Sequence, residues 1–294
     1  DDTPPFMPDQ ESLDIALEVA KLLNYQLVSE LHISRKQYLD GSIPTGFQRT
    51  TIVGVEGWIP YQDRKIGLIQ LGLEEDACRE VSDIGHLRIY RTDRLGMPLI
   101  EMVTQADMHT PAEVADVANI LRWTVRSTGK VRTGIGAARQ DVNVSVTGGT
   151  RVEIKGVSRI PYLPRLIYNE ARRQYSLLQI RQELQRRGIT EKNFQSASAE
   201  VTNLLAKTNW EPLQQALHRQ EEIHCVNLKG FTGILSQSTQ TDKVFSKEIS
   251  DRVRVIACLT RLPNIITSES VEETIDSFTW QKIRKVMNTG SEDA

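Results

Sequence analysis

The stretch Lys65-Ile-Gly-Leu-Ile-Gln-Leu-Gly-Leu-Glu-Glu-Asp76 decides the fold of the first half of the chain. It is apolar over most of its length, which is typical of a buried strand, and it ends in three consecutive carboxylates. Shorter runs of the same kind, separated by Gly, Asp and Pro, occupy residues 51–55, 86–90 and 98–103. This spacing predicts an antiparallel sheet whose acidic residues lie at the strand ends.

Helix and turn signals flank the predicted strands. Residues 9–27 carry apolar side chains at helical spacing behind a capping Asp, and residues 110–127 open on a Thr-Pro pair that starts a second helix. Residues 141–146 and 151–155 read as two further strands joined by a Gly-Gly turn. Together these elements indicate an α+β domain.

Three acidic segments lie among these strands, at residues 73–76, 97–101 and 139–143. A carboxylate beside apolar strand residues is expensive to bury unless a cation or a hydrogen-bond donor lies opposite. Basic side chains are one source of that positive charge, and a metal ion held by oxygen ligands is the other. Three converging segments favour the metal, and their hard oxygen ligands favour magnesium.

The composition is that of an ordinary globular protein. The 294 residues suffice for two domains, and 36 Lys and Arg against 38 Asp and Glu give a formal net charge of −2, so no overall basic field indicates nucleic-acid binding. Three Cys far apart in the sequence favour a reducing compartment over a disulfide framework. No apolar run approaches the ~20 residues that span a bilayer, so we expect a cytoplasmic protein without membrane contact.

The second half begins with an arginine-rich helix predicted over residues 166–187 and ended by Gly188. Its charge fits a solvated face as well as a surface that faces phosphates, and any RNA contact must come from such a local patch. We expect a first domain over residues 1–190, a linker or helical connection over 191–223, and a smaller α+β unit over 224–294.

Five motifs in the first domain resemble those of the tRNA-dependent amidotransferase family, which includes the bacterial GatB type and the archaeal GatE type. They occur in the family's order and spacing over roughly residues 31–174, which is far more specific than any single motif. The motifs are Ser34-Arg-Lys-Gln-Tyr38, Leu73-Glu-Glu-Asp-Ala77, Asp93-Arg-Leu-Gly-Met-Pro-Leu-Ile-Glu101, Arg139-Gln-Asp-Val-Asn-Val-Ser145 and Val152-Glu-Ile-Lys155.

Two features make the GatE type the nearer match. Gly156-Val-Ser-Arg-Ile-Pro161 is similar to the archaeal version, and residues 224–294 resemble the insertion that the GatE type shares with bacterial aspartyl-tRNA synthetases. The resemblance therefore implies an α+β protein with an antiparallel, cradle-like catalytic domain followed by that insert. The alternative is an unusual GatB relative, which would pair with a serine-amidase partner and act on aspartyl-tRNA(Asn) as well.

The resemblance implies a two-step conversion of Glu-tRNA(Gln) to Gln-tRNA(Gln). ATP phosphorylates the glutamyl side chain, and ammonia from an asparaginase-like partner of the GatD type then displaces the phosphate. Phosphoryl transfer needs positioning and charge neutralisation, which Mg²⁺ and cationic side chains supply. ATP, magnesium, tRNA(Gln) and the ammonia-producing partner are therefore the implied ligands and partners.

By match to these motifs, Glu75 and Glu101 are the expected magnesium ligands, because each follows or ends an apolar strand and can project into one cleft. Glu74 and Asp76 are expected to support them. Neighbouring residues of a strand face opposite ways, so one of Glu74 and Glu75 must point away from the site, and the sequence leaves open which.

The other expected site residues also come from the motifs. Asp141, Glu153 and Lys155 are the expected catalytic residues, with Asp141 holding metal or taking a proton from ammonium. A simple ion pair along one strand explains Glu153 and Lys155 equally well. The expected nucleotide-binding residues are Arg35, Lys36, Tyr38, Arg94, Arg139 and Asn143.

In the family, a strand ahead of the matched segment carries a Glu-x-His pair that completes the metal site, and a C-terminal helical region helps to hold tRNA. This sequence shows neither, so we expect a fragment that binds magnesium and ATP weakly and does not amidate alone. A competing hypothesis is a non-catalytic tRNA-binding module, whose affinity would depend on Arg172 or Arg173 and not on the carboxylates.

Overall fold

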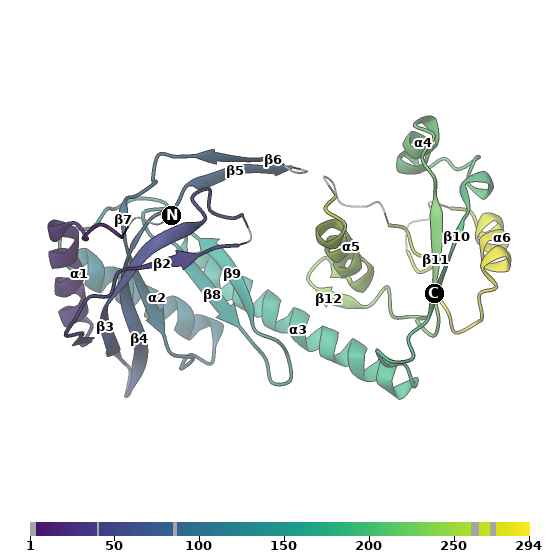
Figure 1. Cartoon of the computed structure of the whole chain (residues 1–294). Coiled ribbons are helices and arrows are strands. Elements are labelled where there is room, and N and C mark those ends of the chain that lie inside the picture. Colours follow the sequence, from purple (N-terminus) through teal and green to yellow (C-terminus); the bar gives the residue numbers. More distant parts are fainter. Residues whose placement is uncertain (1–3, 40, 85–86, 260–264, 271–274) are drawn as a thin grey trace. The chain divides into compact units, whose positions relative to one another are not determined.

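The computed structural model describes the chain except for residues 1–3, 40, 85–86, 260–264 and 271–274. The chain forms two compact units, the first comprising residues 1–142 and 154–167 and the second residues 143–153 and 168–294 (Figure 1). The chain passes between them within the two-stranded sheet of β8 (Gln140–Val144) and β9 (Val152–Val157), and again near the start of helix α3 (Leu163–Arg186). The domain boundaries expected from the sequence, at residues 190 and 223, stay a prediction.

The first unit is built on a five-stranded antiparallel sheet, as the sequence predicts. Its strands are β1 (Gln26–Leu27), β2 (Ser34–Gln37), β3 (Phe47–Tyr61), β4 (Arg64–Glu75) and β7 (Pro98–Thr104). The strand order is β1-β3-β4-β7, and β2 pairs with the first residues of β3. The decisive stretch of sequence thus forms the central strand β4, with β3 and β7 on its two sides.

Two helices of the first unit begin where the sequence predicts. α1 (Gln10–Leu22) follows Asp9, whose carboxylate accepts a hydrogen bond from the Ser12 backbone N–H at 2.9 Å. It ends earlier than expected, because Asn24 adopts a φ of 55° and turns the chain into β1. α2 (Pro111–Ser127) opens on a capping box between Thr110 and Glu113.

α1 and α2 share a single core with one face of the sheet. Side chains alternate along β4, so Leu71 and Leu73 project into this core while Gly72 and Glu74 face the opposite side. Other residues of the core are Ala16, Val19, Ala20, Leu23, Val53, Ile66, Leu68 and Val117. The sheet therefore has a buried face and a second face that is free to carry polar chemistry.

A two-stranded ribbon, β5 (Arg79–Ile84) and β6 (Leu87–Arg91), extends away from this sheet (Figure 1). β6 corresponds to the strand expected at residues 86–90, whose first residue lies outside the described part of the chain. The Tyr90 hydroxyl donates a hydrogen bond to the carbonyl of Gly41, which ties the ribbon to the loop after β2.

The second unit mixes short strands and helices. Its elements are most of α3, β10 (Ser196–Glu200), α4 (Glu211–His218), β11 (His224–Leu228), β12 (Ser238–Gln240), β13 (Lys243–Val244), α5 (Phe245–Ile256) and α6 (Ser277–Met287). α3 forms close to the predicted bounds. β10 and α4 form inside the expected linker, and the sequence does not reveal β10 because four of its five side chains are exposed and show no apolar alternation. The sequence also predicts a polar helix from Glu272, a residue that lies outside the described ones, and α6 begins at Ser277.

Two small cores hold the second unit together. Leu177, Ile180 and Leu184 of α3 pack with a group formed by Phe231, Ile234 and Leu235. The other core joins Val201 and Leu205 to Ile283 and Met287 of α6. This architecture is compatible with α+β, and its likeness to the insert of aspartyl-tRNA synthetase stays a prediction. No helix among the described residues is both long and apolar enough to cross a bilayer.

Candidate active site

On the sheet face opposite the core of the first unit, one lysine lies between two glutamates. The register pairs Gly72 with Glu101, and Glu74 lies two residues farther along β4, so both carboxylates project from the same face. Lys36 on β2 reaches both: its Nζ lies 3.1 Å from Glu74 Oε1 and 3.9 Å from Glu101 Oε2. Two carboxylates from different strands thus converge on one cation.

Glu74 is the buried member of this cluster, with 4% of its side chain exposed. A carboxylate so deep in the protein requires partners, and among the described residues Glu74 has Lys36 and the Thr50 hydroxyl, whose oxygen lies 3.2 Å from Glu74 Oε1. Glu101 is more open, with 42% of its side chain exposed. The cluster therefore has one fixed carboxylate and one that a ligand can reach.

Negative charge exceeds positive charge at this cluster. Burial raises the pKa of Glu101, and the nearby charges of Glu74 and Asp141 raise it further, while Lys36 opposes them. Burial alone would lower the pKa of Lys36, but the hydrogen bond and charge of Glu74, together with the charge of Glu101, hold it above its ordinary value. Lys36 faces two carboxylates, and the charge of Asp141 acts on one of them, so a further cation would be stabilised here.

Glu75 belongs to the other face of the sheet. It follows Glu74 by one residue, shares its face with Leu73, and forms an ion pair with Arg49 of β3. The structure therefore does not bring Glu75 and Glu101 into one cleft as expected from the motifs, but brings Glu74 and Glu101 together. The identity of the metal ligands stays a prediction, and this geometry favours Glu74 over Glu75.

Asp76 joins two of the expected nucleotide-binding residues. Arg139 Nη2 donates to its two carboxylate oxygens at 3.1 and 3.2 Å, and Arg94 Nε lies 3.7 Å from Asp76 Oδ2. Arg94 Nε is buried and has no hydrogen-bond partner among the described residues. Two guanidinium groups share one carboxylate, which leaves a net positive charge beside Asp76.

A pocket of about 400 Å³ opens beside Glu75. Its walls come from the start of α1, β3, the end of β4 and the start of β7; they include Asp9, Ser12, Arg49, Thr50, Leu73, Glu74, Glu75, Gly96 and Pro98. The volume lies in the range of small-ligand pockets. Arg49 and Glu75 give this pocket paired charges of both signs.

Other expected residues of the first unit lie around the Lys36 cluster. The Lys36 ammonium lies 5.7 Å from the ring centre of Tyr38, and the Arg35 guanidinium lies 5.4 Å from that of Phe47. Asp141 affects the pKa of Glu101 and accepts a hydrogen bond from the Gly156 backbone N–H at 2.7 Å.

Besides Asp141, three expected residues lie on the hairpin in which the chain passes between the units. Lys155 belongs to the first unit, and Asn143 and Glu153 belong to the second. Their roles stay predictions.

No group of three or more His, Cys, Asp and Glu side chains lies close enough to hold a metal ion, within the part of the chain that the structure describes. Two carboxylates remain a sufficient protein contribution for magnesium, because this ion is usually bound through one or two carboxylates, waters and substrate phosphates. Glu74 and Glu101 meet that requirement.

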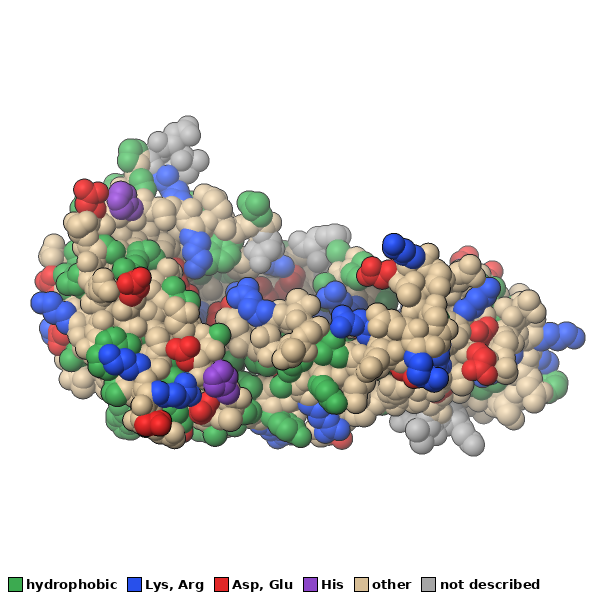
Figure 2. Space-filling model, turned by 90° about the horizontal axis from the view of Figure 1, so that it is seen from below, with side chains coloured by type: hydrophobic (Ala, Val, Ile, Leu, Met, Phe, Trp, Pro, Cys, Tyr) green, Lys and Arg blue, Asp and Glu red, His purple; other side chains and the backbone are tan. Residues whose placement is uncertain are grey.

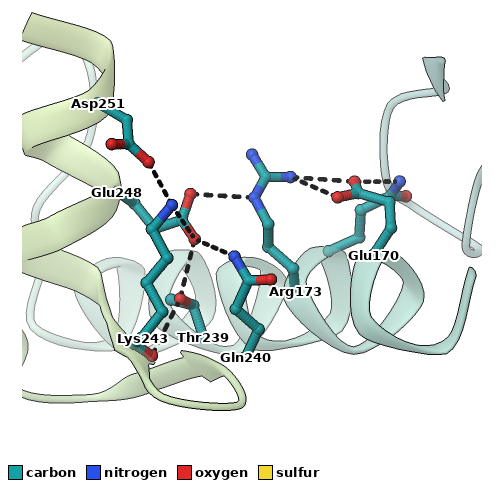
Figure 3. Close-up of polar contacts among 8 residues, drawn as sticks. Glu170, Arg173, Thr239, Gln240, Lys243, Glu248 and Asp251 are labelled. Carbon is teal, nitrogen blue, oxygen red and sulfur yellow. Dashed lines mark hydrogen bonds and ion pairs between the residues drawn. The ribbon is translucent and has the colours of Figure 1, made fainter. Parts of the chain in front are cut away.

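The second unit holds a denser polar network, drawn in Figure 3. Arg173 Nε donates to Glu248 Oε2 at 3.0 Å, and its Nη1 donates to Glu170 at 3.0 Å. The other Glu248 oxygen accepts from Thr239 at 3.0 Å and from Gln240 at 3.1 Å. Lys243 lies 3.8 Å from Glu248 and also pairs with Asp251. The network joins α3, α5 and the β12–β13 hairpin, and within it Glu248 lies beside two cations.

Basic residues form no continuous surface on the face of the molecule that Figure 2 draws. Figure 2 shows Lys and Arg side chains spread over the face drawn, with Asp and Glu among them. This distribution agrees with the net charge of −2. Any RNA contact must therefore depend on a local arrangement of side chains.

The sequence reasoning missed two partners of the acidic motif, Thr50 and Arg49. Both lie on β3 opposite the end of β4, where Thr50 pairs with Glu74 in the register. Their alternation along one strand explains why one bonds Glu74 and the other Glu75. The sequence reasoning lacked the register between β3 and β4, which places residues 47–50 opposite the acidic motif.

The chain matches the family model described as the GatB/GatE catalytic domain over residues 3–259. It is 42% identical to the E subunit of glutamyl-tRNA(Gln) amidotransferase from Sulfolobus acidocaldarius over 282 residues, which are 92% of this chain and 44% of that protein. The corresponding protein of Thermococcus sibiricus is 39% identical over 94% of this chain and 45% of its own length. That of Pyrococcus horikoshii is 38% identical over 100% of this chain and 46% of its own length.

The chain thus spans somewhat less than half the length of these curated relatives. The family match covers most of the chain, including the Lys36 cluster and both arginines that contact Asp76. On these grounds the chain belongs to the GatB/GatE family of amidotransferase subunits.

Proposed function

We propose that this chain forms the ATP- and magnesium-dependent part of an amidotransferase that converts Glu-tRNA(Gln) to Gln-tRNA(Gln). The observation that carries the proposal is the excess of negative charge around Lys36, Glu74 and Glu101 in a chain whose relatives are named as E subunits of glutamyl-tRNA(Gln) amidotransferase. Such a site suits a divalent cation that arrives together with a polyphosphate.

In the proposed reaction, a carboxylate oxygen of the glutamyl side chain attacks the γ-phosphorus of ATP, and ADP leaves. Ammonia then attacks the acyl phosphate, inorganic phosphate leaves, and loss of a proton gives the amide. Magnesium would supply charge neutralisation at the phosphates, with Glu74 and Glu101 as its protein ligands. The oxygen donors of these two residues fit that ion.

The phosphates of ATP also need donors from the protein, and Arg94 and Arg139 are suited to that role. Asp76 holds the two side chains in place, and the buried Nε of Arg94 has no hydrogen-bond partner among the described residues. A phosphate oxygen can accept hydrogen bonds from the exposed parts of the two guanidinium side chains, which are 18% exposed for Arg94 and 30% for Arg139. Lys36, whose pKa is raised despite burial, stays protonated and can share its charge between carboxylate and phosphate.

The second step requires a group that takes a proton from ammonium, and Asp141 is proposed for it. Its Oδ1 is held by the Gly156 N–H at 2.7 Å, and it lies close enough to affect the pKa of Glu101. An asparaginase-like partner is the proposed source of ammonia, with tRNA(Gln) as the RNA and the cytoplasm as the location. The names of the relatives favour the GatE type over a GatB relative.

Calorimetric titration of ATP with magnesium into this chain, at millimolar concentrations, tests the site. We expect magnesium-dependent binding that Glu101→Gln and Glu74→Gln weaken at least tenfold, because each removes a ligand charge. Glu75→Gln is the matched control, since its carboxylate faces the other side of the sheet. Absence of magnesium-dependent ATP binding contradicts the proposal, and equal losses in all three variants contradict the assignment of the ligands.

A further inference from the structure

The outward face of α3 carries an unusual stripe of side chains. Tyr168, Arg172, Tyr175 and Gln179 are three or four residues apart and all exposed, so the helical period places them on one face. The tyrosines are the most telling members, with 56% of Tyr168 and 58% of Tyr175 in solvent. Two aromatic rings and an arginine thus alternate along one exposed surface.

This stripe contributes nothing visible to the packing of α3. The helix is held by its opposite face, where Leu177, Ile180 and Leu184 enter a core. Arg173 is likewise directed inward and pairs with Glu170 and Glu248 (Figure 3). The two neighbouring arginines therefore differ, because Arg173 is a structural ion-pair partner and Arg172 is directed to solvent.

The stripe also carries uncompensated positive charge. Arg172 makes no hydrogen bond or ion pair with any described residue through its side chain. The acidic residues of α3 do not offset it, since Glu170 is bound to Arg173 and Glu183 to Arg186 and Arg187. An ordinary solvated helix face mixes charges of both signs, and this face has none of the negative kind between Tyr168 and Gln179.

We propose that this stripe, defined by Tyr168, Arg172 and Tyr175, binds the sugar–phosphate backbone of an RNA. The guanidinium of Arg172 can donate two hydrogen bonds to one phosphate, and the tyrosine hydroxyls can donate to phosphates on either side of it. The two tyrosines are separated by about 10 Å along the helix axis, given seven residues at 1.5 Å each. The charge complementarity of Arg172 favours RNA over a protein partner.

The identification of this RNA as tRNA rests on the proposed function. The stripe lies in the second unit and shares no residue with the Lys36 cluster, which belongs to the first. RNA binding and magnesium-dependent ATP binding can therefore be lost independently.

The test compares two arginines of the same helix. Arg172 and Arg181 are both exposed, neither has an ion-pair partner among the described residues, and nine residues place them on opposite faces. We expect Arg172→Gln to weaken binding of a tRNA transcript about tenfold, because one phosphate contact is lost. For the same reason, the slope of log binding constant against log salt concentration should become smaller by about one. Arg181→Gln should leave both unchanged. Fluorescence anisotropy at several salt concentrations measures both quantities.

A second pair of variants addresses the tyrosines. Tyr168→Phe combined with Tyr175→Phe removes only the two hydroxyls, and we expect a loss of tRNA affinity of roughly fivefold. Thermal unfolding of every variant should match that of the parent chain, because these side chains are exposed.

Several results overturn the inference. The first is that the parent chain does not bind tRNA at low salt. The second is that Arg172→Gln and Arg181→Gln lower the tRNA affinity equally, and the third is that the double tyrosine variant keeps the full affinity. Loss through Arg172→Gln in a chain that binds no ATP would keep the RNA stripe and end the proposed enzymatic function. If Arg172→Gln leaves tRNA binding unchanged in a chain that binds ATP with magnesium, the proposed enzymatic function is kept and the RNA-binding stripe is rejected. The stripe would then be a candidate surface for a protein partner.

Discussion

Two buried glutamates, Glu74 in the first unit and Glu248 in the second, differ in how their charge is balanced. Glu248 has Arg173 and Lys243 beside it, and its oxygens also accept from Thr239 and Gln240. Glu74 has a single cation, which it shares with Glu101. The first arrangement satisfies a buried charge, whereas the second leaves negative charge for which the described residues offer no further cation.

The pKa values of Glu248 and of Glu101, which shares Lys36 with Glu74, are shifted in opposite directions. Burial alone would raise the pKa of Glu248, but the hydrogen bonds from Arg173 and Thr239 and the charges of Arg173 and Lys243 hold it below its ordinary value. At Glu101, burial and the charge of Glu74 raise the pKa and Lys36 does not offset them. Glu248, which has two cations beside it, stabilises the fold, whereas the Lys36 cluster, in which one cation serves two glutamates, is the place where a ligand cation gains most.

Removal of Arg173 should have the largest effect on stability. Arg173→Met leaves Glu248 buried without its main partner, and we expect the free energy of unfolding of the second unit to fall by about 3 kcal/mol. Urea denaturation followed by circular dichroism measures this change. Arg172→Met is the control, because the neighbouring arginine is exposed and should change stability by less than about 0.5 kcal/mol. Equal effects of the two substitutions would show that Arg173 is not a structural partner.

Several elements of the fold followed well from the sequence. Strand β4, the helix start at Thr110 and Pro111, and the α3 helix were all predicted, because each has a strong local signal in apolar period or capping chemistry. β10 was not, since its exposed side chains carry no such signal and its existence depends on pairing with β11. Local pattern predicts elements well and tertiary pairing poorly.

The candidate site shows the same limit at the level of single residues. The motifs indicated that Glu74, Glu75 and Glu101 lie near one another, but only the register of β4 with β7 shows that Glu74 shares a face with Glu101. The roles of Arg172 and Arg173 could not be separated either, because the contact of Arg173 with Glu248 spans 75 residues of sequence. Long-range pairing decided both questions.

Replacement of Lys36 should have an intermediate effect that magnesium reverses. Lys36→Met leaves Glu74 buried with the Thr50 hydroxyl as its one remaining partner among the described residues, and we expect a loss of about 1–2 kcal/mol of unfolding free energy. Because the negative charge is then larger, added Mg²⁺ should raise the melting temperature of this variant more than that of the parent chain. Lys65→Met is the control, because Lys65 is an exposed lysine of β4 outside the Lys36 cluster. Its Nζ lies 3.7 Å from the ring centre of Trp58. A Lys36 variant that magnesium does not stabilise would argue against a cation site.

The smallest predicted effect separates the Lys36 cluster from the Glu248 network most sharply. At neutral pH, Glu101→Gln should raise the free energy of unfolding, whereas Glu248→Gln should lower it. The folded pKa of Glu101 lies above its ordinary value of 4.5, so the unfolded chain loses this proton first as pH rises, and stability falls through that window. Above it, Glu101→Gln should raise the free energy of unfolding by a few tenths of a kcal/mol, a small gain because solvent screens a side chain that is 42% exposed.

The folded pKa of Glu248 is lowered, so its contribution is present above the unfolded value and is lost as pH falls through the folded pKa. Glu248→Gln should therefore destabilise the chain at neutral pH and lose this effect in acid. Denaturation curves of both variants at pH 4 and pH 7 test the pair. A destabilising Glu101→Gln at pH 7 would mean that Lys36 fully compensates both glutamates, and the reason for placing a metal ion beside them would disappear.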